Sequence, residues 1–292
     1  MVLPMTDART LSIREAVKRI AERVPPLGRA LDARRRHRRV AAARDFIRAG
    51  RLVGADGHPE FVRDVEAVAL ATQLGAAGLW NLEQVARRLA ARGDAGAVVE
   101  CGTWKGGALA FFARSFLRQG GEPQRCPLYG FDSFQGMPRM TAADGAGTSR
   151  WLYGREIDAL EPDLVGGGLV GTGVNLASEA ECRALLAATG YPMDMVHIVA
   201  GWFQDTLPAW RDRIGKIAIL RIDGDFYEST RVCLKTLYDA VIPAGIVIID
   251  DYGTFEGCRR ATDEFMAEFM AKRSAAPELI PIDLGAVYFV KP

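Results

Sequence analysis

The sequence lacks the features on which several common protein classes depend. Its five cysteines are scattered, with no CxxC pair and no Cys/His cluster of zinc spacing. This pattern indicates reduced thiols in a cytosolic protein and no structural zinc site. No apolar run approaches the roughly 20 residues of a membrane span, and charged residues interrupt the N-terminal segment where a signal peptide needs a continuous apolar core. We therefore expect a cytoplasmic protein without a membrane span.

Motifs of two large enzyme classes are also missing. No GxSxG sequence occurs, and the only histidines are His37, His58 and His197, so a hydrolase nucleophile with its base is unsupported. The glycine-rich loop at 101–107 does not fit the GxGxxG spacing that dinucleotide-binding folds place after their first strand. A Rossmann dehydrogenase is therefore disfavoured.

Charge is balanced overall but uneven along the chain. The net charge of +1 gives no general attraction to nucleic acid or membrane. Residues 1–50 nevertheless carry thirteen Lys/Arg against five Asp/Glu, including the run Arg34–Arg39. The run could make a peripheral contact with an anionic surface, or it could be a solvated helix face. Helical periodicity over 10–50, interrupted at Pro25-Pro26, and over 59–92 predicts an N-terminal helical extension covering 1–92.

From residue 93 to 292 short apolar runs alternate with longer helical stretches. Such alternation is typical of an α/β domain with a mostly parallel sheet, here of about seven strands, and helices on both faces. A glycine-rich segment at about 137–178 breaks the alternation and is predicted to form a lid or insertion. The predicted strands are 97–101, 127–132, 195–199, 217–222, 245–250, 279–283 and 286–290. The predicted helices are 105–119, 178–189, 229–241 and 258–272.

Two of the predicted strands end in pairs of acids. Asp223 and Asp225 follow one strand, and Asp250 and Asp251 follow the next. Carboxyl ends of parallel strands meet at one edge of a sheet, where ligands bind. Carboxylates crowded there need a compensating cation, and oxygen ligands suit Mg²⁺ or a similar hard cation. The alternative for either pair alone is an ordinary turn or helix cap.

The loops after the first three strands have features of a nucleoside site. Glu100 precedes a glycine-rich turn, and a carboxylate there suits a cationic ligand such as S-adenosylmethionine better than a phosphate; the alternative is a tight strand–helix turn without a ligand. Asp132, at the end of the second strand, could accept hydrogen bonds from ribose hydroxyls, or it could be a surface acid. Trp202 and Phe203, after Gly201, could pack on an adenine or in the core.

A resemblance to a known family rests on four blocks of sequence. They are VVECGTWKGGALA, YGFDSFQGMP, GWFQDTLP and IDGDFYESTRVCLKTLYDAVIPAGIVIIDDYGTFEGCRRATDEF, in this order. Together they resemble the macrocin O-methyltransferase (TylF-like) family over about residues 80–290. The resemblance implies a Rossmann-like class I methyltransferase fold. It also implies a Mg²⁺-dependent S-adenosylmethionine O-methyltransferase that acts on a hydroxyl of a sugar or other natural-product or glycan acceptor. Cys101-Gly102-Thr103 departs from the Thr-Gly-Val more common in the family.

The resemblance also implies roles for individual residues. Asp225 matches a proposed general base, with Asp223 beside it as a second catalytic residue. The family's metal ligands match Asp223, Asp250 and Asp251. The cofactor site matches Glu100, Gly102, Thr103, Trp104, Asp132, Ser133, Gly201, Trp202, Phe203 and Asp223. A homo-oligomer formed through the N-terminal region is a further expectation.

Two other functions stay open from the sequence. One is a methyltransferase acting on a non-hydroxyl nucleophile, which metal dependence and product analysis would distinguish. The other is a non-catalytic methyltransferase-like scaffold that docks through the basic N-terminal region, which calorimetry with S-adenosylmethionine would test. Clustered carboxylates favour an enzyme, because a scaffold has no need for them. The sequence does not specify the acceptor.

Overall fold

The computed structural model describes residues 25–49, 59–93, 96–153, 169–272 and 277–292. The part of the predicted N-terminal helices before residue 25 lies outside these ranges. Within them, no helix combines the length and the apolar character needed to cross a membrane.

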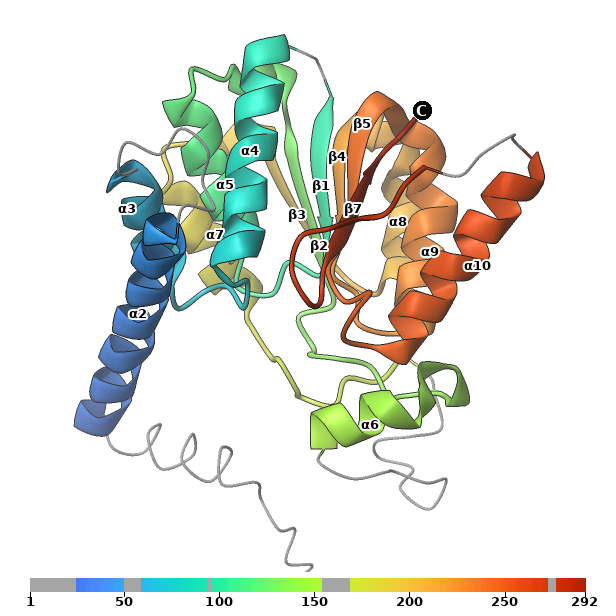
Figure 1. The fold of residues 1–292 in the computed structure, drawn as a ribbon, viewed down its shortest axis with the longest axis horizontal. Helices are drawn as coiled ribbons and strands as arrows, with labels where there is room; N and C mark the ends of the chain where they lie inside the picture. Colours follow the sequence, from blue (N-terminus) through green and yellow to red (C-terminus); the bar gives the residue numbers. More distant parts are fainter. Residues whose placement is uncertain (1–24, 50–58, 94–95, 154–168, 273–276) are drawn as a thin grey trace, which may run out of the picture.

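A single seven-stranded sheet forms the centre of the molecule, in the order β3-β2-β1-β4-β5-β7-β6 (Figure 1). Strands β1 to β5 pair in parallel, and β7 runs antiparallel between β5 and β6. The predicted mostly parallel α/β sheet is therefore confirmed. The strands are β1 Ala97–Cys101, β2 Leu128–Asp132, β3 Val196–Ala200, β4 Ile217–Ile222, β5 Val241–Ile249, β6 Ile280–Pro281 and β7 Val287–Val290.

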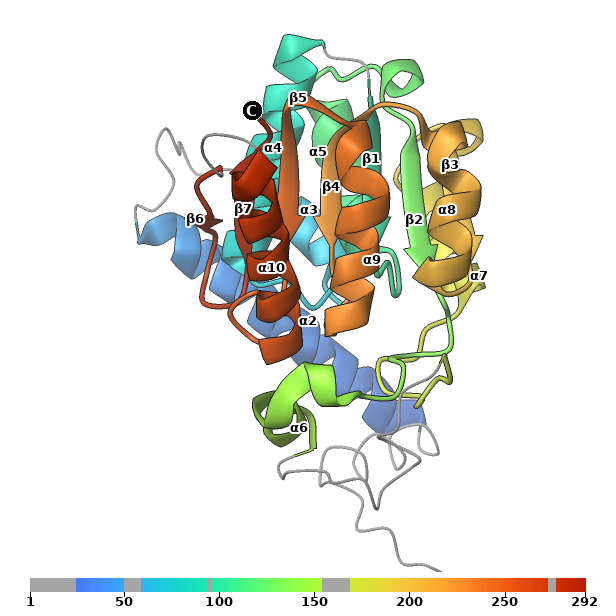
Figure 2. The ribbon, with the colours of Figure 1, turned by 90° about the vertical axis from the view of Figure 1, so that its right-hand side faces the viewer.

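Helices cover both faces of the sheet, as predicted (Figures 1 and 2). The first face carries α4 Ala76–Arg92, α5 Gly107–Arg118 and α7 Glu179–Ala187, and the second carries α8 Phe203–Ile214, α9 Tyr227–Leu237 and α10 Glu256–Lys272. The sequence did not predict α8, whose interior contains Pro208, a residue that usually interrupts a helix. A short helix, α6 Gly145–Tyr153, lies within the predicted insertion.

Alternate residues of each central strand enter two separate hydrophobic cores. In β1, Val98 packs with the helices of the first face, whereas Val99 packs with those of the second. In β5, Ile248 and Val247 divide in the same way. Strands buried on both faces read as continuous apolar runs, which is why the sequence identified them.

The predicted helical region 59–92 consists of two helices, α3 Pro59–Val68 and α4, joined by a turn. Phe61 of α3 packs edge-on against Phe111 of α5, with ring centroids 5.7 Å apart. Helices α3 and α4 therefore share a core with the sheet. Helix α2 Pro25–Arg48 begins at the predicted proline interruption. Residues 34–38 of the basic run are exposed, and their role, like the 1–92 boundary, stays a prediction.

A buried acid ties α4 to α5. Glu83 is fully buried and accepts hydrogen bonds from Arg118 Nη2 at 2.7 Å and Ser115 Oγ at 2.6 Å. Burial by itself would raise the pKa of Glu83, but the hydrogen bonds from Arg118 and Ser115 bring that pKa below its ordinary value. The ionised form of Glu83 therefore stabilises the packing of α4 on α5.

We predict that Glu83→Gln lowers the free energy of unfolding by about 1–3 kcal/mol at neutral pH, because a charged hydrogen-bonding group is lost. Because the pKa of Glu83 is depressed in the folded state, its contribution is present above the unfolded pKa and disappears as pH falls through the folded pKa. Urea unfolding at several pH values should show the difference shrinking on acidification. Glu179→Gln, in an exposed pair with Arg183, is the control; a constant difference would contradict the assignment.

Candidate active site

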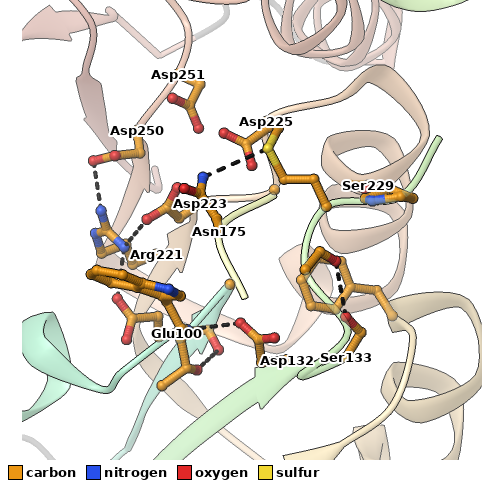
Figure 3. Close-up of a pocket in the computed structure, with 18 of the residues that line it drawn as sticks. Glu100, Asp132, Ser133, Asn175, Arg221, Asp223, Asp225, Ser229, Asp250 and Asp251 are labelled. Carbon is orange, nitrogen blue, oxygen red and sulfur yellow. Dashed lines mark hydrogen bonds and ion pairs between the residues drawn. The ribbon is translucent and has the colours of Figure 1, made fainter. Parts of the chain in front are cut away.

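One pocket at the carboxyl edge of the sheet is lined by every predicted site residue. Figure 3 labels the acids among them. It is formed by the loops that follow β1, β2, β3, β4 and β5. The structure therefore brings together side chains from five separate parts of the sequence, while their individual roles stay predictions. These residues are Glu100, Gly102, Thr103, Trp104, Asp132, Ser133, Gly201, Trp202, Phe203, Asp223, Asp225, Asp250 and Asp251.

A buried arginine lies at the centre of the acids. Arg221, in β4, donates through Nη1 to Glu100 Oε1 at 2.6 Å and to Asp223 Oδ2 at 2.9 Å. Its Nη2 lies 2.7 Å from Asp250 Oδ1. Burial disfavours the charged guanidinium, but Asp250, Asp223 and Glu100 hold the pKa of Arg221 well above its ordinary value. Arg221 is therefore a permanent cation shared by three strands.

Arg221 was not among the predicted site residues, although the sequence carried a signal. A single arginine inside an apolar strand is almost never fully buried unless it is paired. Its partners are Glu100 within β1, Asp223 after β4 and Asp250 after β5, but only the strand order shows which acids it reaches.

Glu100 remains poorly compensated even beside Arg221. Burial raises the pKa of Glu100 to about 8, against the opposing effect of Arg221, and Asp223 and Asp250 raise it further. Its second oxygen, Oε2, is buried and has no hydrogen-bond partner. An unpartnered carboxylate oxygen facing a pocket suits a cationic ligand group such as an ammonium.

A second group of acids consists of Asp223, Asp225 and Asp251. Each contributes one carboxylate oxygen, and these oxygens all lie within 4.8 Å of one another. Burial and the neighbouring carboxylates raise the pKa values of Asp225 and Asp251 well above the ordinary value for aspartate. Oδ2 of Asp251 is buried without a hydrogen-bond partner. This oxygen-only donor set fits a hard divalent cation.

The predicted metal ligands and this group share Asp223 and Asp251. Asp250 instead pairs with Arg221, and Asp225 completes the group. A ligand role for Asp250 stays a prediction. The two acids of the 250–251 pair thus have different partners although they are adjacent in the chain.

Unusual backbone geometry brings β1 and β4 together at the site. Gly102 has a φ of 97°, and a Cβ at this position would lie 1.8 Å from the carbonyl oxygen of Asp223. Only glycine permits this approach. Asp225 has a φ of 58°, in the left-handed region that aspartate tolerates better than most residues.

The nucleoside side of the pocket is built around Asp132. Its Oδ2 accepts a hydrogen bond from the backbone N–H of Trp104 and its Oδ1 one from Phe134, both at 2.7 Å. Burial raises the pKa of Asp132, and these two hydrogen bonds oppose the shift. The carboxylate is therefore fixed in orientation, with lone pairs left for a ligand. Trp202 and Phe203 line the same pocket at the start of α8.

Some lining residues were not predicted. The turn Ala71–Leu74 between α3 and α4, together with Asn175 and Ser229, contributes to the wall. The turn is held in place because the Gly107 N–H donates to the carbonyl of Ala71 at 3.1 Å. The sequence of this turn has no glycine-rich or acidic pattern, so only the tertiary structure identifies it.

Comparison with known proteins gives consistent matches. The model of the macrocin-O-methyltransferase (TylF) family matches residues 18–157 and 172–291. A tetracenomycin 4'-O-methyltransferase of Streptomyces olivaceus, which acts on the 8-demethyl-8-(2,3-dimethoxy-α-L-rhamnosyl) form, is 34% identical and is aligned over 73% of this chain and 76% of its own. Demethyldecarbamoylnovobiocin O-methyltransferase of Streptomyces niveus is also 34% identical, over 75% of this chain and 74% of its own. Mycinamicin III 3''-O-methyltransferase of Micromonospora griseorubida is 30% identical, over 75% and 77%.

Solved structures agree with these matches. The O-methyltransferase NovP is 33% identical, with a TM-score of 0.61 over 76% of this chain and 82% of its own. The calicheamicin methyltransferase CalS11 has a TM-score of 0.54 over 87% and 91%, at 18% identity, and supports the fold alone.

We predict that Arg221→Met lowers the free energy of unfolding by roughly 3–5 kcal/mol, because buried acids lose their cation. Arg231→Met, which removes a surface pair with Glu228, should cost less than about 1 kcal/mol. Urea unfolding of the ligand-free protein measures both. Equal stability of the two variants would show that Arg221 does not hold the acids together.

Proposed function

The chain belongs to the macrocin O-methyltransferase (TylF) family and is an S-adenosylmethionine-dependent O-methyltransferase, and we propose that its acceptor is a sugar hydroxyl of a glycosylated natural product. The relatives support this class of acceptor, since one is named for a rhamnosyl tetracenomycin and another for the 3''-position of mycinamicin III. Family membership also favours a hydroxyl over another nucleophile and catalysis over a scaffold role.

The cofactor would lie between β1, β2 and β3. When bound, S-adenosylmethionine supplies a methyl group on a positively charged sulfur. The unpartnered oxygen of Glu100 would accept from the cofactor's ammonium, and Asp132 would accept from the ribose hydroxyls. Trp202 and Phe203 would contact the adenine. The turn Ala71–Leu74, which lines the pocket, would help to exclude water from the bound cofactor.

Asp223, Asp225 and Asp251 bring one carboxylate oxygen each within 4.8 Å of the others, and Oδ2 of Asp251 has no hydrogen-bond partner. We propose that Asp223 and Asp251 hold a divalent cation, most simply Mg²⁺. Such an ion, when bound, lowers the pKa of a coordinated hydroxyl and orients it. Arg221 pairs with Glu100 and Asp250, whereas Oδ2 of Asp251 has no hydrogen-bond partner and is available to the ion.

We further propose that Asp225 accepts the proton of the acceptor hydroxyl. Its pKa is raised by burial and by Asp223, which makes its carboxylate a stronger base than an ordinary aspartate. When the acceptor oxygen takes the methyl group, the methyl–sulfur bond would break and leave neutral S-adenosylhomocysteine, and the hydroxyl proton would move to the carboxylate of Asp225. The left-handed backbone of Asp225 presents that carboxylate beside Asp223 and Asp251.

Incubation with S-adenosylmethionine, Mg²⁺ and a panel of deoxyhexose glycosides tests the acceptor class. Each glycoside is paired with its free aglycone, and mass spectrometry detects added methyl groups. We expect methylation of glycosides alone, abolished by EDTA and restored by excess Mg²⁺. Methylation of the aglycones would contradict a sugar acceptor, and full activity in EDTA would contradict the metal.

Two matched variants separate the ligand from the base. Asp251→Asn should weaken Mn²⁺ binding by about 100-fold, because a metal ligand is lost. Asp225→Asn should lower kcat by about 100-fold, since the proton acceptor is removed, while Mn²⁺ affinity changes by less than about tenfold. Calorimetry with Mn²⁺ and with S-adenosylhomocysteine provides the two affinities. The affinity for S-adenosylhomocysteine should be unchanged in both variants. Equal loss of Mn²⁺ affinity in both variants would make Asp225 a ligand instead of the base.

A further inference from the structure

A buried acid of the insertion contacts the turn that carries Asp225. Asp144 is only 1% exposed. Its Oδ2 accepts from the N–H and the hydroxyl of Thr141 at 2.6 and 3.0 Å, which fixes its own turn. Its Oδ1 accepts from the backbone N–H of Tyr227 at 2.8 Å. One carboxylate therefore links residue 141 to residue 227.

Tyr227 is the first residue of α9 and lies two positions after Asp225. The first N–H groups of a helix have no partner within the helix. The residue that precedes α9, Phe226, has no side-chain oxygen to supply one. Asp144 supplies it from 83 residues earlier, and its negative charge suits the positive end of the helix.

The insertion also holds the residue between Asp225 and Tyr227. The Phe226 side chain is buried in a small cluster with Met137 and Met140, against which Leu152 and Val174 pack. A left-handed backbone costs a non-glycine residue roughly 1–2 kcal/mol and persists where the surroundings enforce it. On the C-terminal side of Asp225, these surroundings are Phe226 and Tyr227, and the insertion contacts both.

The second acidic strand end meets the same point. Helix α10 begins shortly after Asp251, and a Cβ on its Gly257 would lie 2.7 Å from Asp144 Oδ1 and 2.9 Å from the Tyr227 nitrogen. Glu256 of α10 also lies against the insertion. A Cβ on Gly145 would lie 1.9 Å from the Glu256 carboxylate, so the two residues are in close contact. Asp144 is thus buried at the point where α9 and α10 begin, and these are the helices that follow the two acidic pairs.

We propose that Asp144 is a positioning residue for methyl transfer: by holding the start of α9, it fixes the turn that presents Asp225 to the acceptor. Asp144 does not line the pocket, so it acts through the backbone and touches neither cofactor nor acceptor. The insertion is thereby coupled to the catalytic carboxylate. This inference rests on the proposed role of Asp225 as the base.

The first test compares Asp144→Ala with Glu181→Ala. Asp144 forms a capping box with Thr141, and Glu181 forms one with Ser178 at the start of α7, away from α9. We expect kcat per S-adenosylhomocysteine-binding site to fall at least about tenfold in Asp144→Ala, because the base is displaced. Affinities for S-adenosylhomocysteine and for Mn²⁺ alone should stay within about threefold of wild type, and Glu181→Ala should match wild type.

The conservative variant separates positioning from folding. Asp144→Asn keeps an oxygen that can accept from the Tyr227 N–H, so it should recover part of the lost kcat. A purely structural role would lower the melting temperature and the number of binding sites while leaving kcat per site unchanged. Unchanged kcat per site in Asp144→Ala overturns the proposal.

Hydrogen exchange provides a measurement that needs neither metal nor acceptor. In the S-adenosylhomocysteine complex, the amides of residues 223–230 should exchange at least about tenfold faster in Asp144→Ala, because their local opening costs less free energy. If these amides exchange in Asp144→Ala at the wild-type rate, the proposal is also overturned. If wild-type protein methylates no glycoside, the proposed acceptor fails, and the exchange result still decides whether Asp144 holds the turn.

Discussion

The site depends on one buried guanidinium. A charge removed from water must be paired, and Arg221 is paired with acids of three strands. This is possible because β4 lies between β1 and β5 in the sheet. Glu100 of β1 is the direct parallel partner of Arg221, and Asp250 follows β5 on the other side. The strand order therefore places Arg221 between the acids that keep its charge paired.

The pairing of Arg221 offsets part of the repulsion between the two acidic pairs. Asp250 faces the arginine, while its neighbour Asp251 faces Asp223 and Asp225. Asp223 belongs to both groups, with one oxygen on Arg221. The pocket is thus divided into one group of acids around Arg221, with Glu100 only partly compensated, and a second group, Asp223, Asp225 and Asp251, whose oxygens lie together without such a cation between them.

The sequence predicted most of the fold and the pocket, because both depend on local patterns. Apolar runs identified the strands, and residues at their ends line the pocket, but the turn Ala71–Leu74, Asn175 and Ser229 also line it and had no such pattern. It did not predict α8, because Pro208 interrupts its pattern. It could not predict that Arg221 selects Asp250 over Asp251, or that Asp144 caps α9, since those contacts join residues up to 83 positions apart through the tertiary structure.

The insertion is attached at both sides of the pocket. Before α6, Asp144 and Met140 hold α9 and Phe226. After it, the carbonyl of Leu176 accepts from Trp104 Nε1 at 3.3 Å, while Gly171 pairs with Pro138 within the insertion itself. Trp104 belongs to the loop whose N–H fixes Asp132. The insertion therefore contacts both the turn that carries Asp225 and the loop that fixes Asp132, so a change in how the insertion lies would affect both sides of the pocket.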